Sequence, residues 1–242
     1  MFNFLANPAR FNQVTDRLMP ATAGLAGLFL SIGIISALII SPPDYQQGDT
    51  VRIMYVHVPS AWMALFIYSF IAITSAIGLI WRHPFAHLSA QAAAPIGITF
   101  TILCLTTGSL WGKPMWGAWW VWDARLTSVL FLFFLYLGFM ALNKAFDDPS
   151  RGEKSAAILA LVGFINVPVI KFSVDWWNTL HQPASLLRAD GPAIHSSMLT
   201  PLFLMALGFI FVAVCVLVTR IKVLLLKRRI RLIRINGGKL RS

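Results

Sequence analysis

Long apolar runs constrain the fold of this sequence more than any other feature. A hydrocarbon layer about 30 Å thick is crossed by roughly 20 residues of helix. Six segments qualify: 21–40, 61–80, 92–110, 126–142, 156–170 and 201–218. Charged residues make up only 12% of the 242 residues, about half the share in soluble domains. The sequence therefore predicts an all-α integral membrane protein. We expect residues 1–242 to form a single polytopic membrane domain with six transmembrane helices.

The fifth segment is the weakest of the six because it is short and contains Asn166 and Pro168. It must continue past Lys171 to cross the bilayer, and the lysine amine can reach the interface from there. A proline and an asparagine within a span predict a kink or a wall that faces a cavity. The first segment is longer than the apolar core of a signal peptide, so we expect it to remain as an uncleaved anchor.

Basic residues gather on one side of this predicted bundle. The N-terminus, the loops 81–91 and 143–155 and the C-terminal tail hold 15 of the 20 Lys and Arg, with four of the nine acids. Because cytoplasmic loops are rich in Lys and Arg, we expect both termini to be cytoplasmic. The basic cytoplasmic tail, 220–242, is expected to contact anionic membrane lipid, with docking of a cytoplasmic partner as the alternative. The charge therefore requires no nucleic-acid partner.

Tryptophan is concentrated in one stretch on the opposite, outer side. Residues 111–125 read WGKPMWGAWWVWDAR and hold Trp111, Trp116, Trp119, Trp120 and Trp122. An interfacial aromatic belt explains one or two tryptophans at a helix end, but not five in twelve positions. If Pro114 and Gly117 bracket a helix start near Trp116, then Trp116, Trp119, Trp120 and Asp123 share one face. Such an aromatic shelf at the interface favours a large planar apolar ligand.

Two histidines flank this stretch in the sequence. His57 lies close to the outer end of the second span and His181 just beyond that of the fifth. Two neutral imidazoles, one on each side of the ring, are what bis-histidine ligation of heme iron requires. His195 competes for the second position but has fewer aromatic neighbours. His83 and His87 lie on the cytoplasmic side, where a solvated loop pair is the simpler interpretation.

A heme also carries two propionates, which pair best with Arg or Lys near the interface. The outer side offers Arg52, Lys113, Arg125 and Arg188. Arg52 is five residues before His57 and Arg125 ends the tryptophan stretch, so we expect these two to hold the propionates. The alternative for Arg125 is an interfacial anchor paired with Asp123.

Several segments resemble one protein family. WGKPMWGAWWVWDARLTS is similar to the tryptophan-rich WWD signature of the heme-handling proteins of cytochrome c biogenesis. Within that group the chain resembles the heme exporter protein C (CcmC) family. The segments that carry this resemblance are PPDYQQGDTVRIMYVHVPSAW, APIGITFTILCLTTGS and FDDPSRGEKSAAILALVGFINVPVIKFSVDWWNTLHQ. The resemblance is close over about 40–182, and the number of spans also fits.

The resemblance implies a function in the bacterial cytoplasmic (inner) membrane. The chain would bind heme b at the periplasmic face and present it to the heme chaperone CcmE for covalent attachment during c-type cytochrome maturation. CcmA, CcmB and CcmD, the other subunits of an ABC-type complex, would be its partners. It would be a heme delivery subunit with no hydrolytic chemistry of its own.

The resemblance also implies a set of site residues. His57 and His181 would ligate the iron. Residues 111–128 would form the periplasmic heme-binding segment, with Trp111, Trp116, Trp119, Trp120, Trp122 and Asp123. Arg52, Arg125 and Ser173 match polar positions of the outer site in the family.

Three other functions remain open from the residues. A heme channel across the bilayer is disfavoured because the candidate residues gather on one side and intramembrane charges are few. A b-type electron-transfer subunit usually carries its histidine pairs within facing helices, whereas these histidines flank spans. A structural membrane subunit with an aromatic belt is the third alternative.

Overall fold

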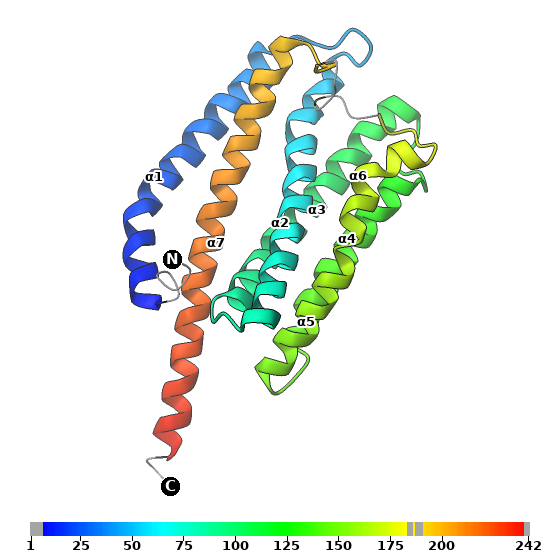
Figure 1. Cartoon of the computed structure of the whole chain (residues 1–242). Helices are drawn as coiled ribbons and strands as arrows, with labels where there is room; N and C mark the ends of the chain where they lie inside the picture. Colours follow the sequence, from blue (N-terminus) through cyan, green and yellow to red (C-terminus); the bar gives the residue numbers. More distant parts are fainter. Residues whose placement is uncertain (1–6, 183–185, 187–190, 240–242) are drawn as a thin grey trace.

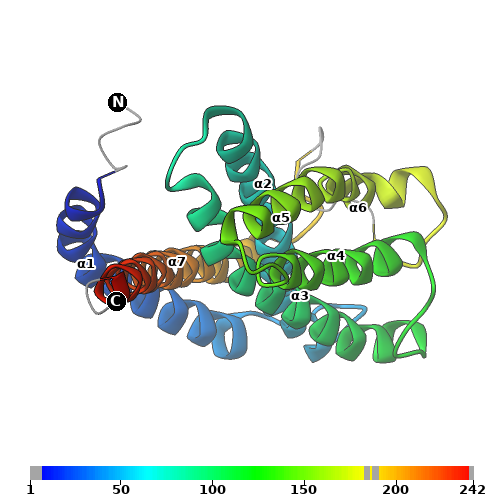
Figure 2. The same ribbon diagram turned by 90° about the horizontal axis from the view of Figure 1, so that it is seen from below.

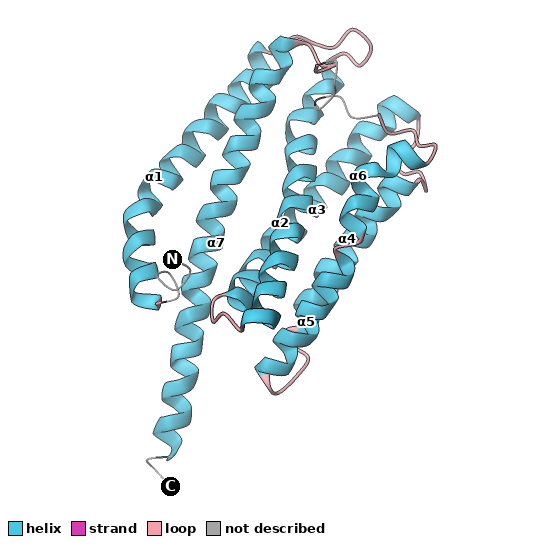
Figure 3. Ribbon diagram, in the orientation of Figure 1, coloured by secondary structure: helices cyan, strands magenta, loops and turns pink. Residues whose placement is uncertain are grey.

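The computed structural model describes residues 7–182, 186 and 191–239, which form a bundle of helices (Figures 1 and 3). In chain order these are α1 (Pro8–Ile35), the π-helix η1 (Ser36–Ile40), the 3₁₀-helix η2 (Asp49–Ile53), α2 (Met54–Trp81), α3 (Ala86–Trp116), α4 (Ala124–Leu142), α5 (Pro149–Gly163), α6 (Asn166–Trp176) and α7 (Ser196–Lys239). The described residues contain no strand, and their one β-bridge joins Asp44 to Gly48. The all-α prediction is confirmed.

Six helical stretches in the described part of the chain are long and apolar enough to cross a membrane. They are Pro8–Ile40, Asp49–Trp81, Ala86–Trp116, Ala124–Leu142, Pro149–Trp176 and Ser196–Arg234. Each contains one of the six predicted segments and extends beyond it, because the helices continue through polar turns at the membrane surface. The prediction of six transmembrane helices is confirmed.

The fifth span is interrupted in its middle. α5 ends at Gly163 and α6 begins at Asn166, and α6 then continues past Lys171 to Trp176. Pro168 has no N–H to donate to the carbonyl of Phe164, and this carbonyl instead accepts a hydrogen bond of 3.0 Å from Val167 N–H. The break agrees with the kink that the sequence predicts.

Pairs of neighbouring helices build the bundle. α1 packs along α7 and α2 along α3, while α4, α5 and α6 form the remaining side (Figures 1 and 2). Small residues of α3, such as Ala94 and Gly97, let α2 and α4 approach closely. At the centre, the fully buried rings of Tyr68 and Tyr136 meet edge to face at 5.1 Å, and Tyr136 donates a hydrogen bond of 2.7 Å to the carbonyl of Ala64.

The start of α1 and the end of α7 lie at one end of the bundle, and the connection between α3 and α4 lies at the other (Figure 1). The tryptophan stretch thus lies at the end of the bundle opposite the start of α1 and the end of α7, and the side of the membrane that each end faces stays a prediction. In the basic tail, Lys222 contacts Asp16 at 2.6 Å and Arg228 contacts Glu153. Lipid contact by the tail stays a prediction, and its residues 240–242 lie outside the described part.

Candidate functional site

A cavity of about 900 Å³ lies at the end of the bundle that carries the α3–α4 connection. Its volume is near the upper end of the range, about 300–1,000 Å³, for cofactor and ligand pockets. α2, α3, α4, α6 and the outer loops contribute to its wall. The predicted site residues that line it are His57, Trp111, Trp116, Trp120, Arg125 and His181. A mainly apolar wall with a few polar groups suits a large apolar ligand.

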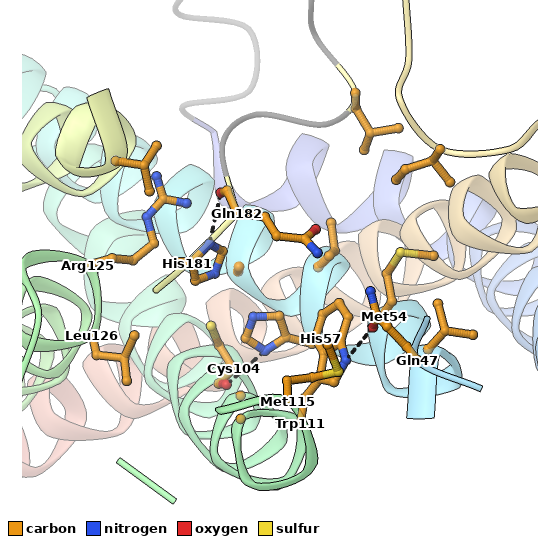
Figure 4. Close-up of a pocket in the computed structure, with 18 of the residues that line it drawn as sticks. Gln47, Met54, His57, Cys104, Trp111, Met115, Arg125, Leu126, His181 and Gln182 are labelled. Carbon is orange, nitrogen blue, oxygen red and sulfur yellow. Dashed lines mark hydrogen bonds between the residues drawn. The ribbon is translucent and has the colours of Figure 1, made fainter. Parts of the chain in front are cut away.

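His57 and His181 face each other across this cavity (Figure 4). Their ring centres are 6.5 Å apart and the ring planes differ by 35°. A metal ion between two imidazoles needs a bond of about 2 Å to each nitrogen, and each nitrogen lies about 1 Å from its ring centre, so the ring centres should be about 6 Å apart. The two rings are therefore spaced to hold one metal ion between them.

Hydrogen bonds set the same tautomer in both imidazoles. The Nδ1 of His57 lies 3.1 Å from the carbonyl oxygen of Cys104, and the Nδ1 of His181 lies 3.1 Å from that of Gln182. A carbonyl oxygen only accepts, so each Nδ1 carries the proton and each Nε2 keeps a free lone pair. Thr107 donates to the carbonyl of Leu103, so its oxygen at 3.2 Å can accept from His57 Nδ1–H as well. Both rings thus present a nitrogen that can bind iron.

The surroundings of His181 favour its neutral form. Burial lowers the pKa of His181 below its ordinary value, and the positive charge of Arg125 lowers this pKa further. A lowered pKa leaves the imidazole unprotonated at neutral pH, as ligation of a metal requires.

Two tryptophans line the cavity next to the histidine rings. Trp111 meets the His57 ring edge to face at 5.7 Å, and its indole N–H donates to Gln47 Oε1 at 2.9 Å. Trp116 lies 6.3 Å from the His181 ring centre. These contacts place an aromatic side chain next to each imidazole.

The predicted helix from Trp116 through Asp123 is wrong. α3 ends at Trp116 because Gly117 adopts a left-handed conformation, with φ of 76°, which ends a helix. Residues 117–123 are an irregular connection, and Asp123 caps α4 by accepting a hydrogen bond of 2.8 Å from Leu126 N–H. The four residues 116, 119, 120 and 123 therefore do not form one helical face.

The remaining tryptophans divide between the cavity and the surface. Trp120 lines the cavity, and its indole Nε1 is buried without a hydrogen-bond partner among the described residues. Trp119 and Trp122 are 55% and 78% exposed and do not contribute to the cavity wall. Trp122 meets Trp120 edge to face at 5.5 Å.

Of the two arginines expected to hold propionates, only Arg125 reaches the cavity. Its Nε donates to Ser173 Oγ at 2.9 Å and its Nη2 donates to the carbonyl of Lys171 at 3.1 Å. Ser173 is fully buried behind the cavity wall and holds this guanidinium in place. Arg125 and Ser173 are thus in direct contact, and their role toward a ligand stays a prediction.

Arg52 lies outside the cavity wall. Its Nη1 donates to the carbonyls of Ala37 and Leu38 at 2.8 and 2.7 Å, and its Nε contacts Asp49 at 3.0 Å. Arg52 therefore donates hydrogen bonds to backbone carbonyls in the last turn of the first span, which have no partner within the helix. Its position five residues before His57 in the sequence does not indicate this structural role. Arg188 lies outside the described residues.

The other histidines have different positions. His195 lines the cavity near its loop side, where its Nδ1 lies 2.8 Å from Ser197 Oγ. His83 and His87 lie in and after the α2–α3 connection at the opposite end, and the ring of His87 packs against Gly78.

Sequence reasoning missed the residues that position His57 and Trp111. They are Gln47, Cys104, Thr107 and Gly108, and none carries a charge or a metal-binding pattern. Three of them lie within APIGITFTILCLTTGS, a segment that contributed to the family resemblance. The cluster of small and hydroxyl residues at the end of the third span was the available signal.

The comparison with protein families decides the membership of this chain. The family profile described as "Heme exporter protein C" (CcmC) matches residues 1–236. The chain belongs to the heme exporter protein C family. This agrees with the resemblance inferred from the tryptophan-rich signature.

Individual relatives are similar over most of their length. The heme exporter protein C of Bradyrhizobium diazoefficiens is 53% identical over 94% of this chain and 86% of its own length. That of Escherichia coli K12 is 44% identical over 93% and 91%. A putative cytochrome c biosynthesis ccmC-like mitochondrial protein of Marchantia polymorpha is 46% identical over 87% and 90%.

Membership in the heme exporter protein C family assigns the chain to heme delivery in cytochrome c maturation. Together with its six membrane-spanning helices, it makes the chain a multi-pass protein of the bacterial inner membrane.

Gly108 leaves the space that the His57 ring occupies, which makes it a sensitive position. A Cβ at Gly108 would lie 2.9 Å from Cε1 and 3.4 Å from Nδ1 of His57. Because two hydrogen bonds hold this ring, we expect Gly108→Ala to displace it and to weaken heme binding by about tenfold, a typical cost of overpacking. Heme titration followed by absorption measures the change. Gly27→Ala is the control because a Cβ there meets nothing within 4 Å, and equal affinities of the two variants would contradict the prediction.

Proposed function

We propose that this chain holds heme b at the outer end of its helix bundle, with the iron between His57 and His181, and presents it to the heme chaperone CcmE. The observation that carries the proposal is the pair of imidazoles 6.5 Å apart across the cavity. Each ring donates its Nδ1 proton to a carbonyl and keeps its Nε2 free. Heme iron binds two such nitrogens, one on each face of the porphyrin.

The remaining wall suits the porphyrin and its carboxylates. The indoles of Trp111, Trp116 and Trp120 offer aromatic surface for the ring. Arg125 supplies a positive charge at the cavity, and the unpaired Nε1–H of Trp120 supplies a further donor for an anionic oxygen. The Arg52 side chain bonds to the carbonyl of Ala37 and to Asp49 rather than facing the cavity. A propionate contact for Arg52 stays a prediction.

Presentation to a chaperone requires an accessible surface beside the heme. Trp119 and Trp122 are exposed next to the cavity wall, and we include them in the surface that the chaperone contacts. Asp123 would keep this connection in place by capping α4. The covalent chemistry then belongs to the heme and the chaperone, while this chain supplies position and iron ligation. We include CcmA, CcmB and CcmD as the partners that assemble with it.

The depth of the cavity favours a one-sided site over a channel. The lining residues deepest along α2, α4 and α6 are Leu65, Leu132 and Ile170. Beyond them, Ile71, Tyr68 and Tyr136 are fully buried and fill the centre of the bundle. A pocket at one end of the bundle and a packed core in its middle therefore support a one-sided site.

The proposal is tested by loading of the chaperone in cells. The full chain and CcmE are expressed in a bacterial host that lacks its own copy of this protein. We expect heme bound covalently to CcmE, detected by heme staining after denaturing electrophoresis, and a low-spin heme spectrum in the purified chain. Equal loading of CcmE with and without the chain would overturn the proposal.

A further inference from the structure

The cavity extends from the two histidines toward the lipid-facing side of the bundle. Ala61, Trp62 and Leu65 of α2 line it on one side, and Lys171 and Val174 of α6 line it on the other. All five lie within membrane-spanning stretches. Trp62 is 38% exposed and Lys171 is also exposed, so both contact the cavity and the surroundings of the protein.

The hydrogen bonds of α6 explain why it stands apart from α2. In the described part of the chain, its three side-chain hydrogen bonds with other helices all join it to α4. Asn166 Nδ2 donates to the Ser128 carbonyl at 2.9 Å, and Arg125 donates to Ser173 and to the Lys171 carbonyl. α2 packs well against α5 but makes few contacts with α6. The break at residues 164–165 thus separates α5, which packs against α2, from α6, which makes few contacts with α2.

We propose that this opening, with Trp62 and Leu65 on one edge and Lys171 and Val174 on the other, is a lateral portal through which heme enters from the outer leaflet. The inference rests on the proposed function, because it takes heme as the ligand of the cavity. Beyond the proposed function, the portal gives heme a path of entry and gives Lys171 a role that iron ligation by the two histidines does not need.

The chemistry of the portal matches an amphiphilic porphyrin. The flat apolar ring of heme partitions into lipid, while its propionates stay near the headgroups, as amphiphilic groups at an interface do. Lys171 places a positive charge at the edge of the portal, near the outer end of its span. Arg125 donates to the backbone carbonyl of the same residue. A carboxylate can therefore pass from the lysine at the edge to the arginine inside the cavity.

The test measures how fast heme reaches the site from lipid and from water. The full chain in phosphatidylcholine vesicles receives heme by fusion with heme-loaded vesicles of the same lipid, whereas the full chain in amphipol, which has no bilayer, receives heme from serum albumin in solution. The rise of the low-spin heme absorption gives the loading rate. Lys171→Glu reverses the charge at the portal, and Val174→Trp fills its edge.

We expect Lys171→Glu to load from vesicles about fivefold more slowly than the wild type, the effect of losing about one exposed charge contact. Val174→Trp should also load more slowly from vesicles, because its larger side chain narrows the opening. The final spectra of both variants and their loading from albumin should match those of the wild type. The controls are Lys113→Glu, an exposed lysine at the same end, and Phe172→Trp, a lipid-facing residue of α6, since neither lines the cavity.

Wild-type loading rates from vesicles in both variants would overturn the portal. Equal slowing from vesicles and from albumin would also overturn it, because the substitutions would then act on the site rather than on the lipid route. A wild-type chain that takes up no heme from either source would instead refute the proposed function.

Discussion

Replacing His57 or His181 by glycine should abolish the low-spin heme spectrum and reduce heme affinity by at least about 100-fold, since even the neighbours of metal ligands are worth 10–100-fold. The two rings lie 6.5 Å apart, so the loss of either leaves the iron with one protein ligand. Chaperone loading should fall with it. The measurement is the absorption spectrum of the purified variant, together with heme staining of CcmE.

Rescue separates ligation from a structural role. Each glycine variant leaves a space of the size of an imidazole, so added free imidazole should restore the low-spin spectrum. His195→Gly is the matched control because this histidine also lines the cavity but bonds to Ser197. The assignment is wrong if the His57 and His181 variants keep the wild-type spectrum, or if only the His195 variant loses it.

Gly97→Ala should cause a large loss of stability in the membrane core. A Cβ at Gly97 would lie 2.2 Å from Cζ and Oη of Tyr136. This ring is fully buried, packs against Tyr68 and donates to the carbonyl of Ala64, so it has no free direction in which to move. Overpacking of this kind costs about 1–3 kcal/mol or more, which exceeds the gain of about 1 kcal/mol from replacing a helical glycine.

The stability change is measured as the free energy of unfolding in detergent and as the yield of folded protein. Gly24→Ala is the control, because a Cβ at that position meets nothing within 4 Å. It should leave stability unchanged or raise it slightly through helix propensity. An unfolding free energy of Gly97→Ala equal to that of the control would contradict the predicted clash.

The tryptophan stretch shows where pattern reasoning fails. Pro114 and Gly117 in the sequence predict the start of a helix, yet Pro114 lies in the last turn of α3 and Gly117 ends it. From the sequence, a proline and a glycine so close together can mark either the start or the end of a helix. The left-handed conformation of Gly117 shows that they mark the end of α3. The tryptophans still gather at one end of the bundle, but three line the cavity and two lie at its surface.

The arginines show a second limit. Arg52 and Arg125 are equally good propionate partners by residue type and by distance along the sequence from a site motif. Their partners decide between them, since Arg52 bonds to the carbonyls that end η1, whereas Arg125 bonds to Ser173 beside the cavity. These partners come from other spans, so no local pattern identifies them.

The amino-acid sequence by itself determined the class of protein, its six spans and the residue types of the site. In lipid each helix must satisfy its own backbone hydrogen bonds, so a span is a local property that composition over about 20 residues reveals. Tertiary structure alone decided that imidazoles 124 positions apart share one cavity. It also decided which arginine reaches them and that α6 bonds to α4 and makes few contacts with α2. These features depend on distances between separate helices, which packing sets and sequence spacing does not encode.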